Sequence, residues 1–203
     1  MKVELHMHTS RYSACARNGP EDMLAELVRQ SYGAAFLTEH DAVWPDEEVE
    51  RLQAAFPGVR IFPGVERGLG ANSTQHLLVL GTNDPAYLRM SDPAEILAAA
   101  KAAGHLTVLA HPMRWPKGAD MLNEGHLPDA LEGCTGNQDP TRAAVAGSLA
   151  ERLGLKLLNS DDAHSVEMVG RFWIETARPL ERADDLRGIV LDGAYENYMC
   201  RNG

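Results

Sequence analysis

The 203-residue sequence is poor in cysteine, in aromatic residues and in net positive charge, and each shortage argues against a class of protein. Its three cysteines, Cys15, Cys134 and Cys200, contain no CxxC pair and predict no disulfide framework, so we expect a reducing, cytoplasmic location. Aromatic residues make up 6%, and 19 basic against 29 acidic residues give a net charge of −10. Long nucleic acid, which needs a basic surface and stacking groups, is therefore not an expected partner.

Long apolar runs and the common nucleotide-binding motifs are also missing. No run approaches the roughly 20 apolar residues of a membrane span, and the N-terminus lacks the apolar core of a signal peptide. Neither GxGxxG nor GxxxxGK[ST] occurs. No linker rich in Gly, Ser or Pro divides the chain, and 44% apolar content is typical of a globular protein. We predict one domain over residues 1–203.

Short β-rich runs alternate with amphipathic runs along the chain. Pro20, Glu21 and Asp22 are placed to start the first helix, and Asp92 and Gly104 are placed to cap a later one. Repeated strand–helix units predict a mostly parallel sheet, and about seven of them favour a small, irregular β/α barrel. The predicted strands are 2–9, 34–41, 59–66, 76–81, 106–112, 130–137, 156–164 and, less regularly, 171–177; the predicted helices are 19–32, 45–56, 92–104, 139–154 and 182–193.

Histidines and acids fall in the predicted strands, mostly at their ends. Strand C-termini in a parallel barrel emerge on one face, so these side chains should converge. On a regular strand, residues i and i+2 share a face, which pairs His6 with His8 and Asp162 with His164, and places Glu4 with His6 as a partner for an imidazole N–H. Glu66 has an alternative role as an ion-pair partner of Arg60 or Arg67. His105 and His126 are expected to be structural. The convergent set is His6, His8, His40, Glu66, His76, His111, Asp162 and His164.

Imidazole and carboxylate groups together suit Zn, Mn or Fe, and a site without cysteine is typical of hydrolysis. Eight candidate ligands exceed the needs of one ion and predict two or three clustered ions, bridged by a carboxylate such as Glu66. Clustered ions stabilise the attacking and leaving oxygens of phosphoryl transfer.

The segments HMHTSRYSA, TEHD, GVE, HLLVLG, AHP and SDDAH, in this order, resemble the PHP (polymerase and histidinol phosphatase) superfamily from Lys2 to about Arg171. The resemblance implies a distorted (β/α)7 TIM-like barrel with metals at the C-terminal ends of the strands. It implies three sites. The first would use His6, His8, Glu66 and Asp162; the second Glu66, His76 and His111; the third His40 and His164.

One position departs from this resemblance. The family usually supplies a His or Asp five or six residues after the second histidine of HxH, where this chain has Ser13 and Ala14. The third site is therefore two-ligand, weak or empty. Cys15 is displaced from the usual spacing, and Asp41 should point away from His40. Asp161, the additional acid of SDDAH, should face away from Asp162.

We therefore expect a metal-dependent phosphoesterase that hydrolyses a small phosphomonoester by attack of a metal-bound hydroxide. His40 or His164 would protonate the leaving group and Asp162 would support catalysis, while Arg114, Arg17 and Arg171 are candidates to bind phosphate. The alternatives are a phosphodiesterase acting on short oligonucleotides and a non-catalytic module with the same fold. The sequence does not determine the substrate, the native metal or the oligomeric state. Trp115, Trp173 and residues 194–200 suit an interface or a capping surface equally well.

Overall fold

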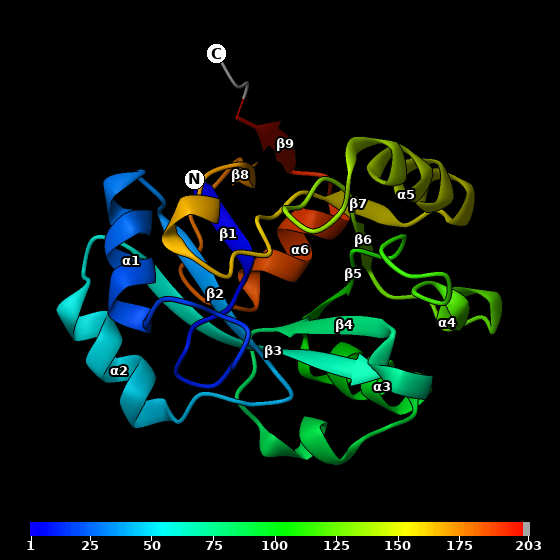
Figure 1. Ribbon diagram of the computed structural model, residues 1–203, viewed down its shortest axis with the longest axis horizontal. Helices are drawn as coiled ribbons and strands as arrows, with labels where there is room; N and C mark the ends of the chain where they lie inside the picture. The colour runs from blue at the N-terminus through cyan, green and yellow to red at the C-terminus, as the bar shows by residue number, and fades with distance from the viewer. Residues whose placement is uncertain (201–203) are drawn as a thin grey trace.

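A computed structural model describes residues 1–200 as one curled sheet wrapped by helices (Figure 1). The sheet has nine strands in the order β7-β6-β5-β4-β3-β2-β1-β8-β9. Predicted residues 201–203 of the domain lie outside the described part. The strands are β1 (Lys2–Met7), β2 (Ala34–His40), β3 (Arg60–Leu69), β4 (Gln75–Leu80), β5 (Leu106–Ala110), β6 (Ala130–Glu132), β7 (Lys156–Leu158), β8 (Phe172–Thr176) and β9 (Tyr195–Met199).

The helices form where capping residues and amphipathic periodicity coincide. Asp92 accepts a hydrogen bond from the Ala94 N–H at 2.8 Å, and Gly104 ends the same helix in the left-handed conformation, as predicted. None of the helices among residues 1–200 is long and apolar enough to cross a membrane. The helices are α1 (Pro20–Arg29), α2 (Asp46–Ala55), α3 (Pro93–Ala103), α4 (Asp120–Asn123), α5 (Pro140–Leu153) and α6 (Asp185–Leu191), with 3₁₀ turns η1 (Ala71–Ser73), η2 (Pro85–Arg89) and η3 (Val166–Met168).

The sheet mixes parallel and antiparallel pairs, whereas the sequence predicts a mostly parallel sheet. β1, β2 and β3 are parallel, as are β5, β6 and β7, but β4 runs antiparallel to both β3 and β5. A 3₁₀ turn rather than a helix joins β3 to β4. The reversal brings the start of β4, instead of its end, to the face where its parallel neighbours end. This is why His76, which opens the strand, reaches the same face as the other histidines.

The barrel is nearly closed by the segment that follows β7. Met7 pairs in parallel with Ala163, and the His8 N–H donates to the Ala163 carbonyl at 2.9 Å. β8 and β9 extend the other side of β1 as an antiparallel pair. Side chains of β9 then return to β7, because Asn197 Nδ2 and Tyr195 Oη both donate to the Leu157 carbonyl, at 2.9 and 3.0 Å. β9 was not predicted, and strand seven ends at Leu158, earlier than expected.

A β-bulge in β1 determines which side chains face the barrel interior. Glu4 pairs with Ala35 and Met7 with Leu37, so β1 carries one extra residue between these points. Val3 and Leu5 lie in the buried cluster that includes Phe36, whereas Met7 packs in the cluster under α1. Without the bulge, His6 and His8 would share the face opposite to Val3 and Leu5. The extra residue turns both histidines inward, and it separates them from the face occupied by Glu4.

Candidate metal centre

The eight predicted metal ligands gather at one end of the barrel. β1 supplies His6 and contributes His8 just beyond its end, and His40 and Glu66 lie at or near the ends of β2 and β3. His76 opens β4, His111 follows β5, and Asp162 and His164 lie in the loop after β7. Three overlapping groups have ligand atoms within 4.8 Å of one another: His6–His8–Glu66, His40–Glu66–His76 and His8–His40–His164.

Glu66 is at the middle of this cluster and is fully buried. Its two oxygens face imidazoles from four other strands or strand ends. The ion-pair partners predicted as an alternative are engaged elsewhere, because Arg60 binds Glu181 and Arg67 binds Asp41. From Oε1 the distances are 2.7 Å to His76 Nδ1, 3.3 Å to His111 Nε2 and 3.4 Å to His6 Nε2; from Oε2 they are 2.7 Å to His40 Nδ1 and 3.2 Å to His8 Nε2.

Asp162 faces three of the same imidazoles, those of His6, His8 and His111. Its Oδ1 lies 3.3 Å from Nε2 of both His6 and His8, and its Oδ2 accepts a hydrogen bond from Asn137 Nδ2 at 2.7 Å. The backbone of Asp162 has φ 49°, and that of His111 has φ 29°, so both depart from the conformations that such residues prefer. Strained backbone of this kind concentrates at functional sites.

The donor set fits divalent metal ions. Glu66 Oε2 and Asp162 Oδ1 are buried oxygens that face imidazole nitrogens but make no geometrically acceptable hydrogen bond within residues 1–200. The Nε2 atoms of His6 and His8 face each other at 3.0 Å. Lone pairs of nitrogen and oxygen atoms are thus directed into a shared space rather than at donors. Such an arrangement is stabilised by cations between the groups, and imidazole with carboxylate suits transition metals.

The outward nitrogens of four imidazoles are held by oxygens of the chain. These contacts place the N–H of each ring on its outer side and leave the other nitrogen free to bind a metal. The pairs are His6 Nδ1 with Glu132 Oε1 at 3.0 Å, His8 Nδ1 with Ser13 Oγ at 3.3 Å, His76 Nε2 with the Ser73 carbonyl at 3.1 Å and His164 Nδ1 with the Asp162 carbonyl at 2.9 Å.

Glu132, at the end of β6, is a member of the site that the sequence analysis did not select. Its Oε1 also accepts a hydrogen bond from Ser160 Oγ, and its Oε2 accepts one from the His111 N–H at 2.8 Å. The carboxylate is 1% exposed. The signal that could have found it was the one used for Glu66, an acid at the end of a buried strand.

Ser13, where the family resemblance leads one to expect a ligand, is engaged in a different role. Its hydroxyl donates to Glu39 Oε2 at 2.5 Å and accepts from the His40 N–H at 3.1 Å, besides its contact with His8. Glu39 in turn accepts hydrogen bonds from the N–H and hydroxyl of Thr9. Asp41 binds Arg67 and the Gly68 N–H, in agreement with its expected direction away from His40.

Glu4 does not contact an imidazole ring, which corrects the prediction from strand alternation. The bulge places its Oε1 to accept from the backbone N–H groups of His6 and Asp161, at 2.9 and 3.1 Å. Burial and the neighbouring Asp161 carboxylate raise the pKa of Glu4 well above its usual value. Asp161 accepts hydrogen bonds from the N–H groups of Gly170, Arg171 and Phe172, and so fixes the loop before β8.

The charges of the centre are strongly coupled. Burial alone would raise the pKa of Glu66, but facing imidazoles, above all those of His6 and His111, hold it well below the usual range. Burial opposes protonation of His8, yet the facing carboxylates of Asp162 and Glu66 raise its pKa to about 9. Burial and the nearby His8 lower the pKa of His164 to about 4.

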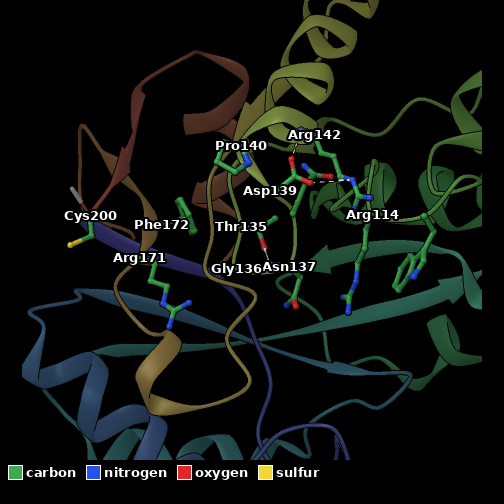
Figure 2. Close-up of a pocket in the computed structure, with 12 residues that line it drawn as sticks. Arg114, Thr135, Gly136, Asn137, Asp139, Pro140, Arg142, Arg171, Phe172 and Cys200 are labelled. Carbon is green, nitrogen blue, oxygen red and sulfur yellow. Dashed lines mark hydrogen bonds and ion pairs between the residues drawn. The ribbon is translucent and has the colours of Figure 1, made fainter. Parts of the chain in front are cut away.

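The three predicted phosphate-binding arginines line cavities beside the centre. Arg114 Nη1 lies 3.9 Å from Asp162 Oδ2, and its guanidinium lies over the Trp115 ring. A cavity of about 430 Å³ is lined by Arg17, Arg114 and Arg171 together with His164. An adjoining cavity of about 930 Å³ shares Arg114 and Arg171 with it (Figure 2).

The remaining sequence predictions concern residues outside this cluster. His105 lies 3.5 Å from Asp184, and His126 lies 3.8 Å from Glu124, so both are remote from the centre. Trp115 contacts the rings of His76 and His111 and forms part of the wall of the centre. Trp173 stacks on Tyr198 of β9, with 5.7 Å between the ring centroids.

Solved structures with the same fold span nearly the whole chain. A two-domain protein from Bacteroides vulgatus that contains a predicted PHP-like metal-dependent phosphoesterase is 19% identical, with a TM-score of 0.73 over 98% of this chain and 64% of that one. PsfC from Pseudomonas syringae is 22% identical, with a TM-score of 0.70 over 98% and 91%. The lesion-specific endonuclease EndoQ from Pyrococcus furiosus is 18% identical, with a TM-score of 0.66 over 97% and 57%.

The chain thus spans less than two thirds of the length of the Bacteroides protein and of the endonuclease. No curated protein matches the sequence. A family model described as PHP-associated matches residues 142–194, which run from within α5 to just before β9. The nearly closed α/β barrel is thus the fold of these structures, and residues 142–194 in addition resemble the PHP-associated family.

Proposed function

We propose that this protein is a metal-dependent phosphoesterase that hydrolyses small phosphomonoesters. The observation that carries the proposal is Glu66, a buried carboxylate whose two oxygens face different sets of imidazoles and which therefore suits a bridge between two ions. Arg114, which lines the cavity beside the cluster, supplies the second requirement, a group to bind the phosphoryl oxygens.

The residues would divide the work as follows. His6, His8, Glu66 and Asp162 would hold one ion, and Glu66, His76 and His111 a second, with Zn, Mn or Fe as the ions that suit these ligands. Bound divalent ions lower the pKa of water and neutralise charge on phosphoryl oxygens. Arg114, adjacent to Asp162, would orient the phosphate. His40 and His164, at the rim of the cluster, would donate a proton to the leaving oxygen.

The position of Ser13 supports a centre in which the third site is weak. Its hydroxyl contacts Glu39, His8 and the His40 N–H. Position 13 therefore adds no carboxylate or imidazole ligand to His40 and His164 at the rim. We propose that two ions suffice for the reaction. The proposed partner is a small phosphorylated substrate, and we propose the cytoplasm as its location, in keeping with three free thiols.

The test is phosphate release from a panel of phosphomonoesters and phosphodiesters with added Mn²⁺ or Zn²⁺, repeated with a chelator. We expect turnover that requires metal and that falls in Asp162→Ala by more than the roughly 10–100-fold that loss of an outer-shell partner costs. His126→Ala is the matched control, because His126 is remote from the centre. Turnover of phosphodiesters alone would replace the proposed substrate class. No turnover by a folded, metal-loaded protein would favour a binding module.

A further inference from the structure

The 430 Å³ cavity beside His164 carries more positive charge than one phosphate needs. Arg17, Arg114 and Arg171 all line it, in a protein whose net charge is −10. One carboxylate, Glu167, lines the same cavity. Within residues 1–200, neither Arg17 nor Arg171 lies within ion-pair distance of a carboxylate, whereas Arg142 on the neighbouring cavity pairs with Asp139 at 3.2 Å. The positive charge of these two guanidinium groups is thus not neutralised by an ion pair within the described residues.

The three arginines differ in their relation to the metal centre. Arg114 is the one that reaches the ligands, with Nη1 3.9 Å from Asp162 Oδ2. Arg171 is tied to the loop before β8, since its backbone N–H donates to Asp161 Oδ1 at 2.8 Å and its Nη2 donates to the Glu167 carbonyl at 3.1 Å. Arg17 is tied to His164, whose carbonyl accepts the Arg17 N–H at 2.8 Å. These backbone hydrogen bonds fix the positions from which the side chains of Arg17 and Arg171 extend.

Figure 2 shows Arg114 and Arg171 extending from opposite sides toward the space that Asn137 borders, while Arg142 lies with Asp139 farther away. Asn137 is fixed there by its hydrogen bonds to Asp162. A phosphate at the metal centre therefore has Arg114 beside it. Arg171 lies across this space from Arg114, and Arg17 lines the same cavity as both.

We propose that Arg17 and Arg171 form a second anion subsite, and that the substrate is a small phosphate ester whose leaving group carries another phosphate or a carboxylate. This inference rests on the proposed function. Water adds to phosphorus as the ester P–O bond breaks, and the leaving oxygen takes a proton, so the products are inorganic phosphate and an alcohol that retains its anionic group. A 430 Å³ cavity is near the small end of ligand sites, which favours a linker of a few carbon atoms.

Three esters of equal chain length test the proposal: propyl phosphate, 3-phosphonooxypropanoate and propane-1,3-diyl bisphosphate. We expect wild-type kcat/KM to be at least about tenfold higher for one or both esters with a second anion than for propyl phosphate, because a charge-assisted contact contributes that much. The comparison of carboxylate with phosphate identifies which second anion the subsite binds.

Arg17→Gln, Arg171→Gln and the double variant identify the residues. We expect each to lower kcat/KM for the preferred two-anion ester by about tenfold more than for propyl phosphate, mainly through KM. Arg152→Gln, an exposed arginine in the last turn of α5, is the matched control and should change neither. Equal losses on all three esters, or no wild-type preference for a second anion, would overturn the subsite.

A failure of the proposed function would look different. In that case the wild-type protein would release phosphate from each of the three esters no faster than Asp162→Ala does. The subsite is then tested by calorimetric binding of propane-1,3-diyl bisphosphonate, which is not hydrolysed, to metal-loaded protein. Weaker binding by the Arg17→Gln/Arg171→Gln variant than by Arg152→Gln supports the subsite, and equal binding contradicts it.

Discussion

Glu132 joins three segments of the centre through one side chain. It contacts the ring of His6, the backbone of His111 and the hydroxyl of Ser160, which come from β1, the end of β5 and the loop after β7. A buried carboxylate in this position orients the His6 ring and raises its basicity as a ligand. It therefore acts on the metal through another residue, and its effect should be visible in metal affinity.

Glu132→Gln should weaken metal binding by roughly 10–100-fold, the usual cost of losing an outer-shell partner. Glutamine keeps one acceptor oxygen but presents an NH₂ group either to His6 and Ser160 together or to the His111 N–H. Competition with a chromophoric chelator measures the affinity directly. Glu151→Gln, on the exposed face of α5, provides the control. If the dissociation constant for the metal is unchanged in Glu132→Gln, then Glu132 contributes to the stability of the fold and not to metal binding.

Glu4 predicts a pH dependence of stability whose sign follows from its raised pKa. A carboxyl group that titrates higher in the folded than in the unfolded state stabilises the fold at low pH, and this contribution is lost as pH rises above its unfolded value near 4.5. Glu4→Gln removes the titration but keeps an acceptor for the His6 and Asp161 N–H groups. Its stability relative to wild type should therefore increase from pH 5 to pH 8.

Chemical denaturation of both proteins at the two pH values, with chelator present, measures this difference. Glu4→Leu is the control, because it loses the acceptor and should be less stable than wild type at both pH values. A Glu4→Gln difference that does not change between pH 5 and pH 8 would mean that the carboxyl group titrates normally.

The centre was predictable at the level of single residues because histidine is a distinctive residue type at strand ends. All eight predicted ligands lie in the cluster, and their binding of metal stays a prediction. Glu132 and Glu39 were missed because acids are common in any sequence. Their partners are distant along the chain, so only the packed barrel shows which buried acid faces an imidazole or a serine hydroxyl.

At the scale of elements, the segment 159–164 that carries Asp162 is supported by β9. Asn197 Oδ1 accepts a hydrogen bond from the Asn159 N–H at 2.8 Å, and Asn197 Nδ2 donates to the Leu157 carbonyl at 2.9 Å.

Sequence patterns predicted most strands and all five of the longer helices, because apolar periodicity and capping residues are local. They did not predict the reversal of β4, because the alternation of apolar and polar residues is the same in either strand direction. They did not predict the bulge in β1 either, because one extra residue does not produce a recognisable sequence pattern.

Asn197→Ala should lower the free energy of unfolding by about 1 kcal/mol, since two hydrogen bonds are lost at a position that water reaches. Urea denaturation measures the change. Met199→Ala, a neighbouring β9 residue with 52% exposure, should have a smaller effect. Equal effects of the two substitutions would indicate that the contact between β9 and β7 adds nothing to stability.

At the scale of the whole molecule, metal binding and folding should be linked. Carboxylates and imidazoles from β1 through the loop after β7 meet at one point, so an ion bound there stabilises only the closed barrel. At 100 times the dissociation constant, the stabilisation is about 2.7 kcal/mol, or roughly 5–10 °C in Tm for a chain of this size.

Thermal unfolding with Mn²⁺ or Zn²⁺ and with chelator tests this linkage. The shift should shrink as pH falls, because protons compete for imidazoles such as His8, whose pKa is raised to about 9. Asp162→Ala should show a smaller shift at any pH. An equal shift in Asp162→Ala would place the stabilising ion elsewhere on the protein.

The reversal of β4 also affects the order in which the centre is assembled. Glu66 and His76 belong to one antiparallel pair and are ten residues apart, whereas Asp162 is separated from His6 by most of the chain. Closing a short loop costs less entropy than closing a long one, and hairpins form within microseconds. During refolding, the bridging carboxylate and one imidazole should therefore meet well before the barrel closes. A metal ion present at that stage has a local chelate to bind, and it can bias the search toward the native register.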